Sequence, residues 1–198
     1  MSLLGSWTYT ASVFRNNQPA AWVLFVHQKS TWHKLYVVEI RRAVPEDSET
    51  IRAIYNNEVT SSLVTLDLIP RSEAEQRFWM AEHSGVYPAI VAVIEGKICG
   101  FASLSPYRAR AGYSTTVEDS IYVDSNYRKQ GIGTSLLNHI LLLANQHGFH
   151  TCMARVMANH EASLSLHESC GFALVGIERE VGRKFGKWLD VALLQKLL

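Results

Sequence analysis

The stretch of sequence that decides the fold is VEDSIYVDSNYRKQGIGTSLLNHILLLANQH, residues 117–147. Its first part, Val117–Val123, has the residue types of a β-strand, and the apolar run Thr134–His147 predicts a helix that ends at Gly148. A turn with basic residues and glycines, Arg128–Gly133, connects the two. Backbone N–H groups at a helix start lack intrahelical acceptors, and the helix dipole adds roughly half a positive charge there. The stretch therefore predicts a cradle for a phosphate group.

The same turn has a simpler interpretation as a connection that binds nothing, because glycines are common in turns anyway. Two features favour a phosphate ligand. The glycines open the helix instead of ending it, and Arg128 and Lys129 add positive charge beside the amides. The turn is not a dinucleotide-binding fingerprint, because Leu136 occupies the third glycine position.

Glu118 lies on the strand just before this turn. Strand alternation places it with Ser120 and Tyr122 on one face, opposite Asp119 and its apolar neighbours. A strand glutamate usually faces solvent. Beside an anion site, however, a carboxylate can act as a base. Glu118 and the predicted phosphate cradle together therefore suggest a transferase that uses a phosphate-bearing cosubstrate.

From Glu39 onward the remaining elements alternate regularly. Ser72 and Glu75 form a capping-box pattern, and Glu95-Gly96 separates two β-branched runs as in a tight hairpin. We expect a single α+β domain over residues 37–198, with a mostly antiparallel sheet and helices on both faces. The predicted helices are 45–60, 72–83 and 161–169, and the further strands are 37–41, 89–94, 97–104, 150–157, 172–178 and 191–197.

Composition excludes several function classes. The chain has 198 residues and a net charge of +1, so charge implies neither a nucleic-acid nor a membrane partner. No apolar run approaches the ~20 residues that span a bilayer. Cys99, Cys152 and Cys170 lack paired spacing, which fits a reducing compartment and predicts a cytoplasmic protein. The histidines show no metal-ligand spacing, so no metal is expected.

Residues 1–36 form a predicted N-terminal extension of unknown role. Residues 1–38 contain no Asp or Glu and many hydroxyl and amide side chains. Such a leader can resemble a transit peptide, and it can equally be an upstream segment unrelated to the domain.

Two motifs together resemble the GNAT superfamily of acetyl-CoA-dependent N-acetyltransferases. The pyrophosphate turn of that family follows an R/Q-x-x-G-x-G/A pattern, matched here by Arg128–Gly133, and a later helix ends in a motif matched by His167–Phe172. The resemblance covers about residues 37–198. Finer features are similar to the phosphinothricin and methionine sulfoximine acetyltransferase branch, namely Ile40–Ala43, Ile54–Asn56, Ser105–Arg110, Glu118, His167 and Gly182–Asp190.

The resemblance implies a GNAT fold in which the Glu118 strand splays from its neighbour to admit acetyl-CoA. Relatives carry an Asn seven residues before the His or Tyr; that position is His160 here, so either His160 or the adjacent Asn159 is expected at the pantetheine arm. Ser163 is expected nearby. The residues that would hold the pyrophosphate and pantetheine are Ile121, Tyr122, Val123, Arg128, Lys129, Gln130, Gly131, Ile132, Gly133 and Thr134.

The resemblance also assigns the chemistry. Glu118 stands where relatives have the general base that removes a proton from the acceptor amine, and a backbone N–H near Val123 would polarise the thioester carbonyl. His167 stands where many relatives have the Tyr that protonates the departing thiolate. A lone histidine on a helix face is otherwise more often structural, so this role stays open.

The acceptor is expected to be a small amino acid or analogue such as phosphinothricin or methionine sulfoximine. Two guanidiniums suit the carboxylate and phosphinate or sulfone groups of such a molecule. The acceptor loop would comprise Arg108, Arg110, Ala111, Gly112 and Tyr113. The family also implies a homodimer whose interface involves the Gly182–Asp190 loop. Other amines, such as a protein N-terminus, a lysine or a polyamine, and a non-catalytic acyl-CoA sensor remain alternatives.

Overall fold

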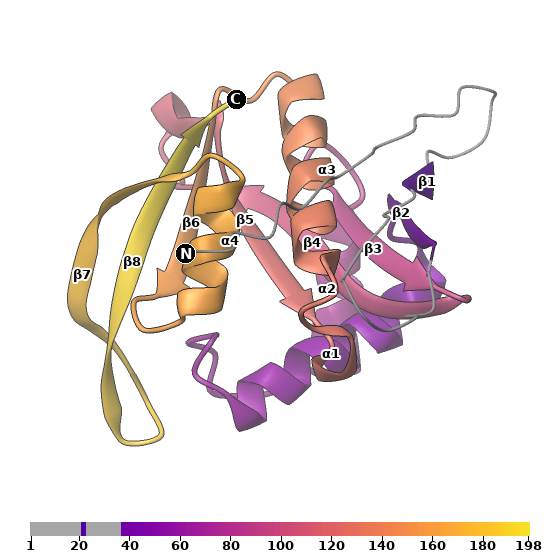
Figure 1. Cartoon of the computed structure of the whole chain (residues 1–198), viewed down its shortest axis with the longest axis horizontal. Coiled ribbons are helices and arrows are strands. Elements are labelled where there is room, and N and C mark those ends of the chain that lie inside the picture. The colour runs from indigo at the N-terminus through magenta and orange to yellow at the C-terminus, as the bar shows by residue number, and fades with distance from the viewer. Residues whose placement is uncertain (1–20, 23–36) are drawn as a thin grey trace, which may run out of the picture.

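The computed structural model describes residues 21–22 and 37–198 (Figure 1). The strands of these residues form one sheet in the order β1-β2-β3-β4-β5-β6-β8-β7. Within the described chain, β5 and β6 are the one parallel pair of neighbours and the other pairs are antiparallel, which confirms the mostly antiparallel prediction. The strands are β1 (Ala21–Trp22), β2 (Val38–Arg42), β3 (Ala89–Ile94), β4 (Lys97–Pro106), β5 (Thr116–Val123), β6 (Thr151–Met157), β7 (Ala173–Lys184) and β8 (Lys187–Leu197).

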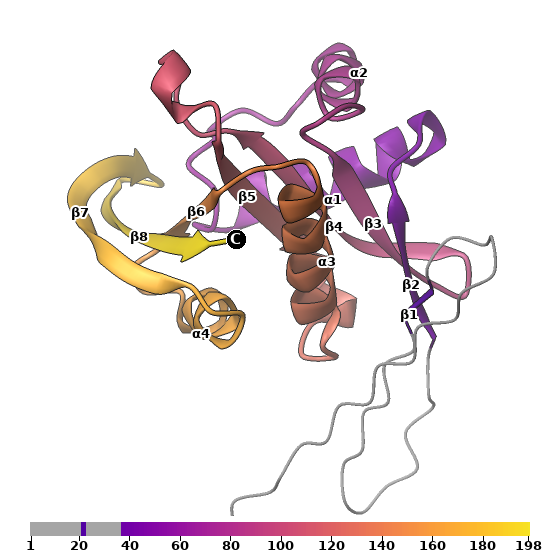
Figure 2. The same ribbon diagram turned by 90° about the horizontal axis from the view of Figure 1, so that it is seen from above.

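Helices cover both faces of the sheet, as predicted. Figure 2 shows α1 and α2 on one face and α3 and α4 on the other. Short 3-10 turns precede α1, β5 and α3. The helices are α1 (Ser48–Ser61), α2 (Glu73–Glu82), α3 (Ile132–Gln146) and α4 (Glu161–Ser169), and the 3-10 turns are η1 (Pro45–Asp47), η2 (Ala111–Tyr113) and η3 (Ser125–Tyr127).

Each face of the sheet has its own core. On one face α3 buries Leu136, Leu137 and Ile140 against the centre of the sheet. On the other face, α1 packs the side chains of Ile51 and Ile54 against strands β3 and β4. Burying one such side chain stabilises the fold by about 1.5–3 kcal/mol, so the two cores hold β3, β4 and β5 rigidly between the helices.

Strands β5 and β6 diverge in the middle of the sheet. Their parallel pairing runs from Thr116 opposite Thr151 to Glu118 opposite Met153, while β5 continues to Val123 and β6 to Met157. Each strand keeps its outer neighbour, β4 for β5 and β8 for β6. The edges of 119–123 and 154–157 therefore open a gap in the sheet, which is the strand splay that the family resemblance implies.

The local predictions differ in how well they agree with the structure. The hairpin around Glu95-Gly96 and the helix Glu161–Ser169 are confirmed, and the Ser72 hydroxyl caps α2 with Glu75 completing the box. Helix α3 begins at Ile132, two residues earlier than predicted.

The prediction that Gly182–Asp190 forms a loop is wrong. Strands β7 and β8 remain paired there, with Gly182 opposite Leu189 and Lys184 opposite Lys187, so the segment is the tip of a long hairpin. Its glycines and charges are typical of a loop, but Lys184 is buried and its Nζ donates to the Thr65 carbonyl oxygen at 2.8 Å. This tertiary contact, which no local pattern reveals, anchors the hairpin.

The predicted extension, residues 1–36, lies outside the described residues apart from Ala21–Trp22. These two residues pair antiparallel with Glu39 and Val38 at the edge of the sheet. Among residues 21–22 and 37–198, no helix is long and apolar enough to cross a membrane.

Candidate active site

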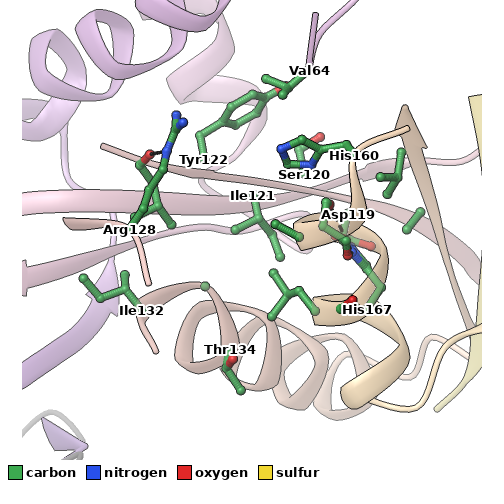
Figure 3. Close-up of a pocket in the computed structure, with 18 of the residues that line it drawn as sticks. Val64, Asp119, Ser120, Ile121, Tyr122, Arg128, Ile132, Thr134, His160 and His167 are labelled. Atoms are coloured by element: carbon green, nitrogen blue, oxygen red, sulfur yellow. Dashed lines mark hydrogen bonds and ion pairs between the residues drawn. The ribbon is translucent and has the colours of Figure 1, made fainter. Parts of the chain in front are cut away.

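A cleft of about 640 Å³ occupies the gap between β5 and β6. Its walls are residues 119–123 of β5, residues 154–157 of β6, the turn before α3 and one side of α4 (Figure 3). Because the strand edge itself is exposed, side chains from both faces of β5 reach the cleft. In Figure 3, Ile121 lies in the middle, with Arg128 and Ile132 toward the left and Asp119 with His167 toward the right, and Thr134 lies below Ile121.

The predicted cradle lies at the start of α3. Gly131 is the residue before the helix and has φ +79°, a left-handed conformation that glycine adopts without strain. The first helical bond is donated by the Ser135 N–H to the Gly131 carbonyl oxygen at 3.1 Å, so the amides of 132–134 lie in front of the hydrogen-bonded turns. Gly131, Ile132, Gly133 and Thr134 all line the cleft, whereas Gln130 does not.

Arg128 is held by the protein itself. Its guanidinium forms a short ion pair with Glu58, whose side chain is buried on α1, and its Nε donates to the Val123 carbonyl oxygen at 3.1 Å. These bonds tie helix α1 to the turn and fix one positive charge beside the cradle. Arg128 thus positions the turn in addition to supplying charge.

Removing the Glu58–Arg128 ion pair should lower both the stability of the fold and the affinity for acetyl-CoA. Glu58→Gln leaves Arg128 without its charged partner, and we expect it to lower the free energy of unfolding by about 1 kcal/mol, because the guanidinium is half exposed. The Kd for acetyl-CoA, measured by calorimetry, should rise. The control is Glu49→Gln, which breaks an exposed Glu–Arg pair on the same helix and should change neither quantity. An unchanged Kd in Glu58→Gln would contradict the positioning role of Arg128.

The middle of the cleft is lined by Tyr122, Val123, His160 and Ser163 together with Ile121. The structure brings His160 to the cleft, whereas Asn159 is exposed and is not part of the lining. Burial lowers the pKa of His160, and the nearby charge of Arg128 lowers it further, against a smaller opposing effect of Glu58. Both effects favour the neutral form of the His160 ring.

Glu118 lies at the last paired position of the two strands, on the face covered by α1 and α2. Its carboxylate Oε2 is 3.2 Å from Nη1 of Arg155, which lines the cleft. Burial raises the pKa of Glu118, and the charges of Asp119 and Glu178 add to this, while Arg155 acts in the opposite direction. Glu118 itself does not line the cleft; it adjoins the cleft through its neighbour Asp119 and its ion-pair partner Arg155, which do. A partly buried carboxylate with a raised pKa beside a cleft has the properties of a general base.

His167 and Asp119 form a buried pair at the end of the cleft nearest Glu118 along β5. The ring Nε2 lies 3.1 Å from Asp119 Oδ2, and Nδ1 donates to the Ser163 carbonyl oxygen at 2.7 Å. Burial alone would lower the pKa of His167, but the hydrogen bond and charge of Asp119 outweigh it and raise that pKa. The other carboxylate oxygen of Asp119 accepts from the Cys152 thiol at 3.6 Å.

Sequence reasoning missed two residues of this site, Asp119 and Arg155. Strand alternation correctly places Asp119 opposite Glu118, among apolar side chains. A charged residue at an apolar position is the signal that could have marked it as paired. Arg155 could have been found in a similar way, because it is a charged residue in the middle of a strand whose other residues are all buried.

The predicted acceptor loop lies beyond the end of β4. Its Arg108 guanidinium stacks near two aromatic rings, 4.8 Å from the centroid of Tyr107 and 5.6 Å from that of Tyr113. Arg110, Ala111 and Gly112 are exposed. None of these loop residues lines the cleft. The structure brings Arg108 and Tyr113 together, and the charge of Arg108 also acts on Glu118.

Among the described residues, no group of three or more His, Cys, Asp or Glu side chains is arranged to hold a metal ion. The groups that the site does offer are backbone amides, the guanidiniums of Arg128 and Arg155, carboxylates and two imidazoles. The amides of the cradle suit a pyrophosphate, and the strand edge left open by β6 suits an amide-containing arm, so the site fits acetyl-CoA.

Known proteins share this arrangement. The acetyltransferase (GNAT) family model matches residues 51–172. The phosphinothricin N-acetyltransferase of Streptomyces coelicolor is 36% identical over 81% of this chain and 96% of its own. The L-methionine sulfoximine/L-methionine sulfone acetyltransferase of Pseudomonas paraeruginosa is 35% identical over 79% of this chain and 92% of its own.

A solved structure agrees with these matches. The GNAT superfamily phosphinothricin acetyltransferase from Sinorhizobium meliloti, in complex with AcCoA, superposes with a TM-score of 0.79 at 36% identity, covering 81% of this chain and 88% of its own. The family model covers more than half of the sequence, including the cradle, the splayed strands and the His167 helix. The chain therefore belongs to the acetyltransferase (GNAT) family.

Proposed function

We propose that this protein transfers an acetyl group from acetyl-CoA to the α-amine of a small amino acid or amino-acid analogue. The observation that carries the proposal is the position of Glu118, a carboxylate of raised pKa at the last paired position before the strands separate. The relatives named for phosphinothricin and methionine sulfoximine support this acceptor class.

In this proposal the amides of residues 132–134 hold the pyrophosphate, with the charges of Arg128 and Lys129 beside them. The pantetheine arm lies along Ile121–Val123, where the strand edge facing β6 offers free backbone groups, and it contacts His160 and Ser163. When bound, acetyl-CoA supplies the acetyl group as an activated thioester. The backbone N–H near Val123 polarises the carbonyl of that thioester.

Glu118 activates the acceptor. An amine arrives as an ammonium ion and cannot attack until it has lost a proton. Glu118 accepts this proton, directly or through one water, and its raised pKa makes the transfer more favourable than for an ordinary carboxylate. The amine nitrogen then forms its bond to the carbonyl carbon while the carbon–sulfur bond breaks. The nitrogen releases its second proton to solvent, which leaves a neutral amide, and Glu118 afterwards returns its own proton to solvent.

His167 supplies the proton that the sulfur needs. Its pKa is raised by Asp119, which favours the protonated ring, and both residues line the cleft. One proton passes from the pair to the departing thiolate, and solvent restores it after release. Asp119 also orients the ring, because the two ring nitrogens are held by different partners.

We further propose a cytoplasmic homodimer. The β7–β8 hairpin carries exposed apolar side chains, among them Val181, Phe185 and Trp188, which suit burial against a second copy. The three cysteines are free and buried, as suits a reducing compartment. Sedimentation of the wild type and of a Trp188→Lys variant tests the dimer, since a charge in the interface should shift the protein toward monomer.

The function is tested by thiol release from acetyl-CoA with a panel of acceptors. We expect turnover with phosphinothricin, L-methionine sulfoximine or L-methionine sulfone, and little with spermidine or a peptide amine. Acetyl-CoA binding without turnover on any amine would instead indicate a sensor. Turnover confined to polyamines or peptides would overturn the proposed acceptor class.

A further inference from the structure

Arg155 stands out on β6 because the strand is otherwise buried. The pattern of Thr151–Met157 has one exposed residue, Arg155, two positions beyond Met153, the partner of Glu118. In a parallel pair, residues at these positions share a face of the sheet, so Arg155 and Glu118 project to the same side. Arg155 thus stands at the point where the two strands separate.

Charged groups and an aromatic ring surround its guanidinium. Nη1 is 3.2 Å from Oε2 of Glu118, and Nε is 4.0 Å from Oε2 of Glu178. The guanidinium carbon lies 5.8 Å from the ring centroid of Tyr107, at the base of the predicted acceptor loop. Glu178 thereby holds one edge of the guanidinium while another faces the general base.

The Glu118–Arg155 pair remains accessible to a ligand. The side chain of Arg155 is 37% exposed and that of Glu118 is 22% exposed, and Arg155 lines the cleft. A partly exposed ion pair contributes little net stability, typically below about 1 kcal/mol. A ligand that replaces the pair therefore loses little free energy by breaking it. A replacement that leaves either charge unpaired would be unfavourable.

A zwitterion can replace the Glu118–Arg155 ion pair and still leave neither charge unpaired. A free α-amino acid carries an ammonium group and a carboxylate on one carbon, so it can pair with Glu118 through the first and with Arg155 through the second. Building on the proposed function, we propose that Arg155 binds the α-carboxylate of the acceptor and so selects free amino acids over other amines. Guanidinium and carboxylate match in planar, two-bond geometry, which a lysine cannot reproduce.

Arg155 suits this role better than the loop arginines. Arg108 lies against the rings of Tyr107 and Tyr113, and its charge acts on Glu118 without an ion pair between them, whereas Arg155 contacts Glu118 directly at 3.2 Å. Arg110 is exposed. These residues remain available to the acceptor side chain, which extends away from the amino and carboxylate groups. A peptide N-terminus lacks an α-carboxylate and has a neutral carbonyl there, so the Arg155 charge would gain no partner from it.

The test compares an acid with its amide. The rates kcat/KM of the wild type, Arg155→Met and Arg155→Lys are measured with L-methionine sulfone and with L-methionine sulfone amide. We expect Arg155→Met to lower kcat/KM for the acid by about 10- to 100-fold, mainly through KM, and that for the amide by less than about threefold. Arg155→Lys should fall between wild type and Arg155→Met. The matched control is Arg77→Met, an exposed arginine on α2, which should alter neither rate.

Two further measurements keep the result unambiguous. The Kd for acetyl-CoA and the unfolding midpoint of each variant should stay near wild type, which excludes loss of fold as the cause. An Arg155→Met enzyme that keeps the wild-type preference for acid over amide overturns the inference while leaving the proposed function intact.

If the wild type acetylates no amino acid, the proposed function fails, and calorimetry of L-methionine sulfone binding decides the inference separately. Binding that Arg155→Met abolishes supports the carboxylate site. Equal binding by both proteins, or none by the wild type, overturns it.

Discussion

Glu118→Gln should lower kcat by about 10²- to 10⁴-fold while the Kd for acetyl-CoA stays unchanged. The amide keeps the shape of the side chain and can still hydrogen-bond, but it cannot accept a proton from an ammonium ion. Acetyl-CoA is held by other residues, namely the amides of residues 132–134 and the strand edge Ile121–Val123, so the substitution should leave its binding unchanged. Single-turnover acetylation of L-methionine sulfone at saturating acetyl-CoA measures the effect.

The pH dependence of the same reaction provides a second readout. Because burial raises the pKa of Glu118, the base is active only above a pKa higher than the ordinary 4.5 of a glutamate, and kcat/KM should rise with pH through that raised value. The Glu118→Gln enzyme should lack this rising limb. Glu82→Gln, which removes an exposed carboxylate on α2, should keep both the rate and the limb. Unchanged turnover in Glu118→Gln would remove Glu118 from the mechanism.

Local signals account for most of what the sequence predicts correctly. The hairpin at Glu95-Gly96 and the Ser72 cap each depend on a few adjacent residues, and each appears in the structure. The helix after the glycine turn is also present, although it begins at Ile132 and not at Thr134. The strand splay follows instead from the family resemblance. No spacing in the sequence says that pairing ends at Glu118 opposite Met153.

The features that sequence reasoning missed depend on contacts between distant segments. Asp119 meets His167 48 residues later, and Arg155 meets Glu118 across a strand pair. The extended β7–β8 hairpin depends on Lys184 reaching the Thr65 carbonyl oxygen, 119 residues away. Propensity and periodicity describe neighbours in sequence, so they locate the elements but not the partners of buried charges.

The Asp119–His167 pair leads to the second large expected effect. Asp119→Asn removes the charge that raises the pKa of His167, so burial should then dominate and bring that pKa below 6.5. The ring would be unprotonated at neutral pH and unable to protonate the thiolate. We expect kcat to fall on the order of 10- to 100-fold at pH 7.5. Two-dimensional NMR of the labelled ring reports the pKa directly.

Stability should change in a defined pH window. The folded pKa of His167 lies above its unfolded value of 6.5, so the pair stabilises the fold fully below pH 6.5 and loses this contribution as pH rises through the folded pKa. Asp119→Asn should therefore lower the free energy of unfolding by about 2 kcal/mol at pH 6 and by less at pH 9. Asp190→Asn, at a carboxylate that accepts a bond from the Glu180 amide outside the cleft, serves as the control and should show no such pH dependence.

A double-mutant comparison separates positioning from a general loss of fold. If Asp119 acts through the ring, adding Asp119→Asn to a His167→Gln enzyme should cost little further activity, because the group it serves is already absent. If instead the activity loss of the double variant equals the product of the losses of the two single variants, the Asp119 carboxylate acts independently of His167. An Asp119→Asn enzyme with the wild-type pH profile would show that the proton for the thiolate comes from another donor, and His167 would then be a structural residue that holds Ser163 and the start of α4 against the cleft.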